Sequence, residues 1–305
     1  MAFYSPDRAM SETLGQLVAR LEAAGRPGLR EQLSITWLLV DRSLSGEVDR
    51  SLPLRGASHG GDVLRYPASV IKLVYLVAAE AWLQRGWLRE EPELRRALAA
   101  MIQDSSNDAT GYVVDRLSGT TSGPELRPPE AAAWESQRQL VNGWLASLQW
   151  PELRGCNACQ KTWGDGPFGR ERIFYGERLE NRNRLSTDAT ARLLHGVMTS
   201  TLVSPPAGLR MQALLRRSLD PGGRVLDPEN QVDGFLGEGV PVESRLWSKA
   251  GWMSQARHDA AYIAPPPGTP FLVVVMSAGA AAAADTTLLP AIARSVLQAC
   301  GGSAP

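Results

Sequence analysis

The chain has few cysteines, few histidines and no net charge, and each shortage excludes a class of protein. Its 305 residues include three cysteines and three histidines. Three cysteines are too few to cross-link a secreted fold by disulfides, and one thiol would stay unpaired. This count fits a reducing compartment. The 32 basic residues balance the 32 acidic ones, so no electrostatic field favours nucleic acid or an acidic membrane surface. We therefore expect no nucleic-acid partner.

Long hydrophobic runs are also missing. In residues 1–25, carboxylates interrupt the apolar positions, so the unbroken apolar core of a secretory signal is absent. The longest weakly polar run, residues 271–284, falls short of the roughly 20 apolar residues that span a bilayer. We therefore expect no membrane span. As written the chain is predicted to be cytoplasmic, or periplasmic if the true start lies upstream.

The remaining composition, 44% hydrophobic and 21% charged, is that of an ordinary folded chain. Strand patterns occur towards both ends, at 34–40, 47–54, 245–249, 260–264 and 271–276. Helical periodicity occurs at 9–24, 70–87, 94–102, 108–117, 140–148, 187–198 and 286–300. Strands at both ends with helices between them predict an α/β (α+β) fold. We expect an antiparallel sheet of about five strands, flanked by N- and C-terminal helices, plus an inserted all-helical lobe.

The same pattern predicts two lobes with a cleft between them as the default site. Residues 1–64 and 220–305 would form the sheet-containing lobe, and residues 65–219 the helical lobe. A long glycine-containing loop is expected at about 155–185, and loops of this length are usually functional or mobile. Cys156 and Cys159 form a CxxC there, but no second CxxC follows and no strand precedes it, so a plain loop is preferred to redox or metal chemistry. The scattered histidines predict no metal site.

Lysine is the scarcest charged residue, and two of the three lysines, Lys72 and Lys249, stand beside serines; the third is Lys161. Unlike arginine, lysine can give up its proton near neutral pH when it is buried or set beside another cation. Ser69 and Lys72 lie three residues apart, just after Pro67 and at the start of an apolar helical run, so the amine can reach the hydroxyl. The helix start adds positive potential. The alternative is a capping serine and a lysine at a helix rim.

Two further segments carry polar groups at element ends. Ser105, Ser106 and Asn107 interrupt two helical runs and, taken alone, suit a helix cap. Lys249 and Gly251 lie at the end of a predicted strand, where glycine permits close backbone approach and lysine could hold a carboxylate. Taken alone, this second segment is an exposed strand end.

Together and in this order, SxxK, Ser-x-Asn and Lys-x-Gly resemble the motifs of the class A β-lactamase family of penicillin-recognising serine enzymes. The resemblance covers most of the chain, because 258–266 and 271–275 are similar to that family's last two strands. Residues 184–194 are similar to the helix start after its active-site loop. The resemblance implies a small-molecule amide or β-lactam substrate, no cofactor and a monomer.

The resemblance also implies roles for the helical residues. Ser69 would be the acylated nucleophile and Lys72 its proton partner. Ser105 would relay a proton to the leaving nitrogen, and Asn107 would hydrogen-bond the substrate amide.

On the strand side, Lys249 would face the substrate carboxylate, and Gly251 would complete the motif. The backbone N–H of Ser69 would supply half of an oxyanion hole, and the strand just after Gly251, at Met253, would supply the other half.

Three departures from the family pattern bear on substrate choice and turnover. Ser106 stands where the family usually has aspartate, and Ala250 where it usually has threonine. The Glu-x-x-Leu-Asn motif, whose glutamate activates the water that releases the acyl group, is missing as such. Glu177 keeps the spacing to Asn181 and is the candidate for this role, ahead of Glu180. The alternative for both is a solvated loop carboxylate.

The resemblance therefore leaves three functions open. The first is a serine hydrolase that cleaves a β-lactam-type amide through a Ser69 acyl-enzyme. The second is a D-alanyl-D-alanine peptidase or another amidohydrolase such as a glutaminase, which needs no loop glutamate. The third is a non-turnover or degenerate penicillin binder, which the altered loop favours.

Overall fold

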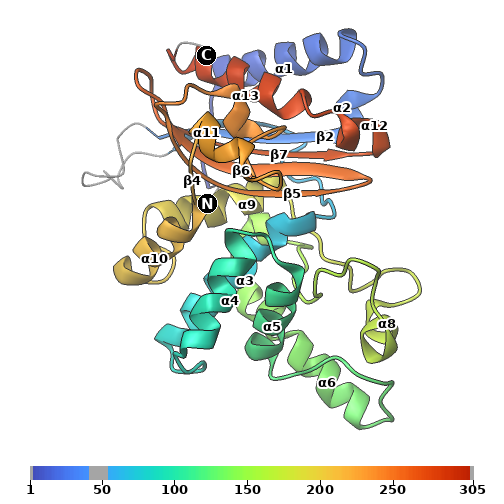
Figure 1. Ribbon diagram of the computed structural model, residues 1–305. Helices are drawn as coiled ribbons and strands as arrows, with labels where there is room; N and C mark the ends of the chain where they lie inside the picture. Colours follow the sequence, from blue (N-terminus) through green and yellow to red (C-terminus); the bar gives the residue numbers. More distant parts are fainter. Residues whose placement is uncertain (1–2, 41–53, 303–305) are drawn as a thin grey trace.

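The chain folds around one sheet, seen in a computed structural model that describes residues 3–40 and 54–302. Within these residues seven strands pair in the order β1-β3-β2-β7-β6-β5-β4 (Figure 1). The strands are β1 (Ser5–Pro6), β2 (Leu33–Leu39), β3 (Arg55–His59), β4 (Arg216–Arg217), β5 (Arg245–Met253), β6 (Ala256–Ala264) and β7 (Phe271–Ala278). All neighbours are antiparallel except β1 and β3. Both ends of the chain therefore contribute strands to the same sheet, with β2 beside β7 at its centre.

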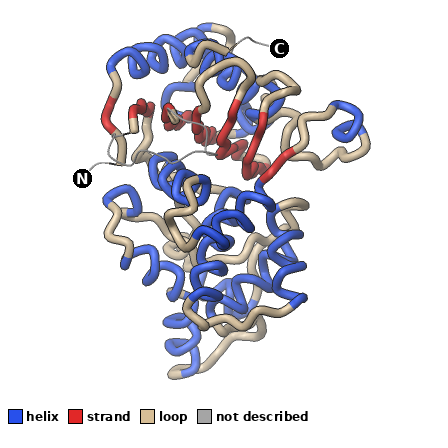
Figure 2. The backbone as a smooth tube through the Cα atoms, turned by 90° about the vertical axis from the view of Figure 1, so that its left-hand side faces the viewer, coloured by secondary structure: helices blue, strands red, loops and turns tan. Residues whose placement is uncertain are grey.

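Helices cover both faces of the sheet. The α-helices are α1 (Arg8–Ala23), α2 (Leu29–Gln32), α3 (Ile71–Gln84), α4 (Pro92–Ile102), α5 (Asn107–Ser118), α6 (Glu130–Arg138), α7 (Leu140–Ser147), α8 (Gly169–Tyr175), α9 (Thr187–Met198), α10 (Pro205–Leu215), α11 (Pro221–Val225), α12 (Ala280–Ala284) and α13 (Leu288–Ala299), and the 3₁₀ turns are η1 (Ala68–Val70), η2 (Pro151–Leu153) and η3 (Leu236–Gly239). Helices α1, α12 and α13 lie on one side, and α3 to α10 lie on the other (Figures 1 and 2). Within the described residues, no helix is long and apolar enough to cross a membrane.

The predicted fold class is confirmed, with a larger sheet than the five strands expected. The two additional strands, β1 and β4, have two residues each, too short for a periodic pattern to reveal. The second strand was predicted at 47–54, of which 47–53 lie outside the described residues. The observed partner of β2 is β3, at 55–59. Its sequence, Arg-Gly-Ala-Ser-His, contains no strand-forming residue, so pairing with β2 rather than propensity specifies it.

The helices that the sequence did not predict include α6, α8 and α10. Helix α8 lies inside the expected long loop and has only seven residues, so its periodicity is weak. Helix α10 begins with Pro205, a residue that suits the first helical turn but also punctuates loops. The division of the chain at residues 64 and 220 stays a prediction, and β4 lies just before its second boundary.

The core lies on both sides of the sheet, and β7 shows why its sequence is almost continuously apolar. Leu272, Val274 and Met276 join the cluster on the side of the helical layer. Val273 and Val275 join the cluster under α1 and α13. Successive strand residues point to opposite faces, so a central strand covered on both faces needs apolar residues throughout.

Helix α3 runs through the helical layer and is buried on every side. Every residue from Ile71 to Trp82 is buried, including Lys72 and Glu80. A helix that is apolar all round packs inside a protein rather than on its surface. The first turn of α3 therefore delivers the Lys72 amine into an environment without bulk water.

We predict that Gly239 is required for the packing of η3 against α13. A Cβ at Gly239 would collide with the Pro290 carbonyl oxygen and lie 2.8 Å from the Ala293 Cβ. Gly239→Ala is therefore expected to lower the free energy of unfolding by about 1–3 kcal/mol, the range for overpacking, as measured by urea denaturation. The control is Gly143→Ala in α7, where a Cβ meets open space and stability should rise by up to about 1 kcal/mol. Equal effects of the two substitutions would contradict the prediction.

Candidate active site

The segment that carries Ser69 is a strained turn leading into α3. Ser69 lies in η1, and the N–H of Val70 donates to the Pro67 carbonyl at 3.0 Å. Ala68 has a φ of +45°, a left-handed conformation that costs a non-glycine residue about 1 kcal/mol or more. The Ser69 side chain is half-buried, and its hydroxyl makes no hydrogen bond to another described residue. Ser69 is therefore a free hydroxyl on a backbone that its surroundings hold in place.

Strand β5 approaches this turn so closely that only glycine fits at the contact. A Cβ at Gly251 would lie 2.7 Å from the Ser69 nitrogen and 2.8 Å from the Val70 nitrogen. These are backbone atoms and cannot move aside as a flexible side chain would. Gly251 thus fixes the distance between the sheet and the Ser69 turn, as a close backbone approach requires.

The next strand holds the same turn through a histidine. His258 lies opposite Gly251 in the β5–β6 ladder. Its Nδ1 accepts the N–H of Ser277 at 3.1 Å, so its Nε2 carries the proton and donates to the Tyr66 carbonyl at 2.8 Å. Burial lowers the pKa of His258 to about 4, which keeps the ring neutral. Two neighbouring strands therefore position the turn that carries Ser69.

The Lys72 amine meets the junction between α4 and α5. Its Nζ lies 2.9 Å from Asn107 Oδ1 and 3.2 Å from Ser105 Oγ, and it donates to the Ser105 carbonyl. Ser105 has a φ of +54°, a second strained residue beside the cluster. Burial lowers the pKa of Lys72 from 10.5 to about 7, because an apolar environment disfavours the ammonium form. A large share of the Lys72 amine is therefore neutral at physiological pH.

Lys249 reaches the same serine from the sheet. Its Nζ lies 3.0 Å from Ser105 Oγ and 2.8 Å from the Ala250 carbonyl, and it donates to Gln231 Oε1. The residue is 0% exposed. Burial, followed by the nearby cations Arg217 and Lys72, lowers the pKa of Lys249 well below its usual value.

The Ser105 hydroxyl thus stands between two amines, at 3.2 Å from one and 3.0 Å from the other. A hydroxyl has one proton to donate and two lone pairs that accept. It can therefore donate to one amine while it accepts from the other, and the pair of hydrogen bonds can reverse. Such an arrangement can move a proton along Lys72, Ser105 and Lys249.

Two side chains that sequence reasoning missed hold this cluster together. Gln231 Nε2 donates to the carbonyls of Ile102 and Gln103 at 3.0 and 2.8 Å. Arg217 donates from Nη2 to the Ile102 carbonyl at 2.8 Å and to the Ser248 carbonyl at 3.1 Å. Both satisfy carbonyls at the end of α4, which have no partner within the helix. They tie the helix that precedes Ser105 to β5.

The expected long loop is anchored by a second buried group of charges. Lys161 Nζ lies 2.7 Å from Asp115 Oδ2 and 2.7 Å from Ser122 Oγ. Arg138 and Glu171, both with fully buried side chains, form an ion pair beside them. Asp115 lies on α5, the helix that begins at Asn107, so the loop and the Lys72 cluster share one support.

Glu177 is not brought to the cluster. It is exposed and makes no hydrogen bond to another described residue, while Glu180 accepts the backbone N–H of Arg178 at 3.1 Å. The loop contacts α3 through Gln160, whose carbonyl accepts a hydrogen bond from the Tyr75 hydroxyl at 2.6 Å. The Gln160 side chain is 2% exposed, and its amide bonds to no described residue. No motif surrounds Gln160, so no sequence signal marks it.

The remaining candidates lie outside the hydrogen-bonded cluster. Met253 ends β5, is 40% exposed and pairs with Ala256. All three cysteines are free thiols.

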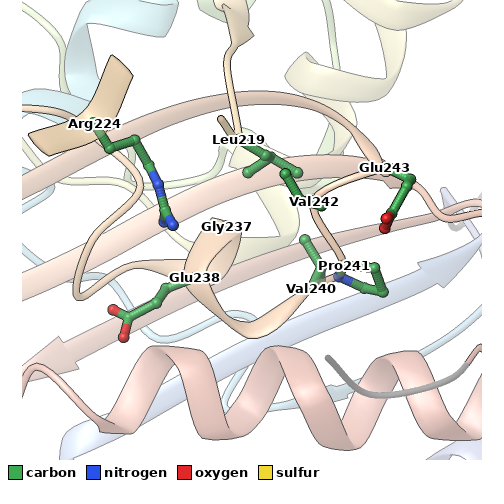
Figure 3. Close-up of a pocket in the computed structure, with 8 residues that line it drawn as sticks. All are labelled: Leu219, Arg224, Gly237, Glu238, Val240, Pro241, Val242 and Glu243. Carbon is green, nitrogen blue, oxygen red and sulfur yellow. The ribbon is translucent and has the colours of Figure 1, made fainter. Parts of the chain in front are cut away.

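A pocket of about 340 Å³ lies away from the Ser105 cluster (Figure 3), lined by Leu219, Arg224, Gly237, Glu238, Val240, Pro241, Val242 and Glu243. None of these lining residues belongs to the Ser105 cluster.

Comparison with known proteins gives a family and a fold. The profile of the β-lactamase enzyme family matches residues 82–300, a stretch that begins after Ser69 and Lys72. The comparison with curated proteins returned no match.

Among solved structures, the chain resembles PBP-A, with a TM-score of 0.63 and 17% identity over 97% of both chains. It also resembles a mutant of PBP-A in an acyl-enzyme complex with penicillin G, with a TM-score of 0.62 and 18% identity over 98% of both chains. A β-lactamase from Sphaerobacter thermophilus matches with a TM-score of 0.63 and 20% identity, over 95% of this chain and 97% of that one. At these identities the likeness establishes the fold.

The pKa of Lys72 predicts a pH dependence that can be measured directly. Above pH 7 the amine is mostly neutral and can accept a proton from a hydroxyl; below pH 7 it is mostly an ammonium and cannot. With only three lysines in the chain, side-chain carbon NMR on labelled lysine should show one resonance with a midpoint near 7. Lys72→Arg should remove that resonance. A Lys72 midpoint near 10 would contradict the assigned burial effect.

Proposed function

Because the chain belongs to the β-lactamase enzyme family, we propose that it is a serine hydrolase that opens an amide bond of the β-lactam type through an acyl-enzyme on Ser69. One observation carries the proposal. The Ser105 hydroxyl lies between two buried amines, and the amine with a pKa of about 7, Lys72, follows the free Ser69 hydroxyl by one helical turn. This arrangement supplies a nucleophile, a base and a proton relay.

The proposed acylation step moves one proton around a short cycle. The neutral Lys72 amine uses its two N–H groups on the Ser105 carbonyl and Asn107 Oδ1. When the Ser105 hydroxyl donates to Lys249, the lone pair of Lys72 is left to accept the Ser69 proton. The Ser69 oxygen attacks the substrate carbonyl, and the C–N bond breaks. Ser105 donates its proton to the leaving nitrogen and recovers one from the Lys72 ammonium. The cycle ends with an acyl ester on Ser69 and a neutral Lys72.

The oxyanion would be held by two backbone N–H groups, and the strand geometry selects the second. The sequence suggested that the N–H of Met253 is the second donor, together with the N–H of Ser69. The N–H of Ala250 donates to Gln231 Oε1 at 3.2 Å, on the side of β5 away from β6. Because N–H groups alternate along a strand, that of Trp252 shares this open side, while that of Met253 points towards Ala256. We therefore assign the second donor to Trp252 in place of Met253.

Slow release of the acyl group is the second candidate behaviour, and a specific observation favours it. Among the described residues, no carboxylate bonds to Lys72, Ser105 or Asn107. Without a carboxylate to deprotonate water, an ester formed from a β-lactam on Ser69 would persist, as in a penicillin-binding protein, or in a peptidase that releases only the ester of its own amide substrate. The same acylation machinery serves all three functions, and they differ in the lifetime of the ester.

Ser69→Ala tests the nucleophile. Intact-protein mass spectrometry of the wild type with benzylpenicillin should show a mass increase equal to the whole molecule, because ring opening expels no fragment. The Ser69→Ala variant should show no adduct and an unchanged melting temperature. Ser106→Ala, which removes only the cap hydroxyl of α5, is the control and should still acylate. An adduct of the same yield on Ser69→Ala would remove Ser69 from the mechanism, and a wild type that shows neither an adduct nor turnover of benzylpenicillin would refute penicillin acylation.

Glu177→Gln tests the loop carboxylate. Removing a general base slows a reaction by about 10²- to 10⁴-fold, but the exposed position of Glu177 provides no contact with the cluster. We therefore expect the half-life of the acyl-enzyme to change by less than about twofold, within the ±0.5 kcal/mol of ordinary surface substitutions. Glu180→Gln is the matched control on the same turn. A half-life lengthened by a factor of ten for Glu177→Gln alone would assign it the base role.

A further inference from the structure

The strand side of the site does not present Lys249 to a substrate. The sequence pattern assigns this lysine to a substrate carboxylate, but the structure turns its amine into the protein. Its three contacts, Ser105 Oγ, the Ala250 carbonyl and Gln231 Oε1, are all protein atoms, and the residue is 0% exposed. An amine has at most three N–H groups, so each already has a partner.

Gln231 supplies the acceptor that a substrate carboxylate would otherwise provide. Its Oε1 accepts both from Lys249 Nζ and from the N–H of Ala250 at 3.2 Å. An oxygen held between an amine and a backbone N–H is the arrangement by which proteins bind one oxygen of a carboxylate. The Gln231 amide nitrogen is held in turn by two carbonyls of the α4 end. Both ends of the amide are therefore engaged, and Gln231 is 3% exposed.

The neighbouring cation is occupied in the same way. Arg217 directs Nε and both terminal nitrogens at the carbonyls of Ser248, Ile102 and Gln103. Burial lowers the pKa of Arg217 to about 10, so it stays charged at neutral pH and disfavours a second charge on Lys249. Ala250, between Lys249 and Gly251, packs its methyl group into the cluster under α13 and offers no hydroxyl.

Resting on the proposed acyl-enzyme function, we propose that this site selects acyl substrates without a carboxylate beside the scissile amide, and that Gln231 determines this specificity. A carboxylate entering at Lys249 would have to displace Gln231 Oε1 and leave a buried amide without its partner. A neutral group at the same place would leave the Gln231 contacts intact. The substrate class is therefore a neutral strained or activated amide.

The test compares benzylpenicillin with its methyl ester. The second-order rate constants for Ser69 acylation are measured by intact-protein mass spectrometry, and each is divided by the rate constant of ring opening by hydroxide. We expect the ester to react at least as fast as the acid. If benzylpenicillin reacts about tenfold faster than its ester or more, a difference of about 1.4 kcal/mol, the proposed specificity is overturned. The proposed acyl-enzyme function would still stand. If neither compound gives an adduct and neither is turned over, both proposals are overturned.

Gln231→Ala tests the residue itself, with Gln212→Ala as the matched control. Gln212 Nε2 bonds to the carbonyls of Val197 and Met198 at the end of α9, as Gln231 does at the end of α4, but it does not contact Lys249. Gln231→Ala should raise the acid-to-ester ratio about tenfold by freeing the Lys249 donors, and Gln212→Ala should leave it unchanged. Equal ratios in the two variants would overturn the role of Gln231. If Gln231→Ala does not fold, the wild-type ratio still decides the substrate class.

Discussion

The burial of two lysine amines around one serine hydroxyl is the constraint on which the site depends. Water would keep both amines charged, and a charged Lys72 could not accept a proton. Removing the water lowers both pKa values, but every polar atom then needs a protein partner. The chain meets this demand with the Ser105 carbonyl, Asn107 and Gln231. The chemistry and the packing of the site are therefore set by the same contacts.

Bringing these groups together requires the sheet to touch the helical layer without a side chain between them. Gly251 provides that contact at Ser69, and His258 holds the preceding carbonyl from the adjacent strand. The close approach also explains why the adjacent residues are strained. Ala68 and Ser105 both have positive φ, and such conformations persist only where the surroundings over-determine them. Core packing on both faces of β6 and β7 makes the sheet rigid enough to impose this geometry.

The sequence predicted the parts of the site that local patterns carry. The scarcity of lysine and the spacing of Ser69 and Lys72 marked the segment of the proposed nucleophile, and strong periodicity located α3, α5 and β5. It could not predict Gln231 or Arg217, because both lie in segments without periodicity and act through main-chain carbonyls more than 100 residues away. Strand β4 and helix α8 were missed for a related reason, since elements of two and seven residues owe their form to tertiary contacts.

The proposed acylation and the proposed substrate recognition depend largely on different atoms of this molecule. The side chains proposed to acylate Ser69 lie on η1, α3 and the Ser105 turn, and β5 contributes the Trp252 N–H as the second proposed oxyanion donor. The atoms that would recognise a carboxylate belong to β5, where Gln231 Oε1 accepts from Lys249 Nζ and the Ala250 N–H, and Arg217 donates to the Ser248 carbonyl. The loop that would supply a base is anchored through Lys161 and Asp115, with its candidate carboxylates, Glu177 and Glu180, exposed. We therefore expect changes at Gln231 or in the loop to alter what is bound and how long the proposed ester lasts, while the proposed proton cycle between Lys72 and Ser105 is retained.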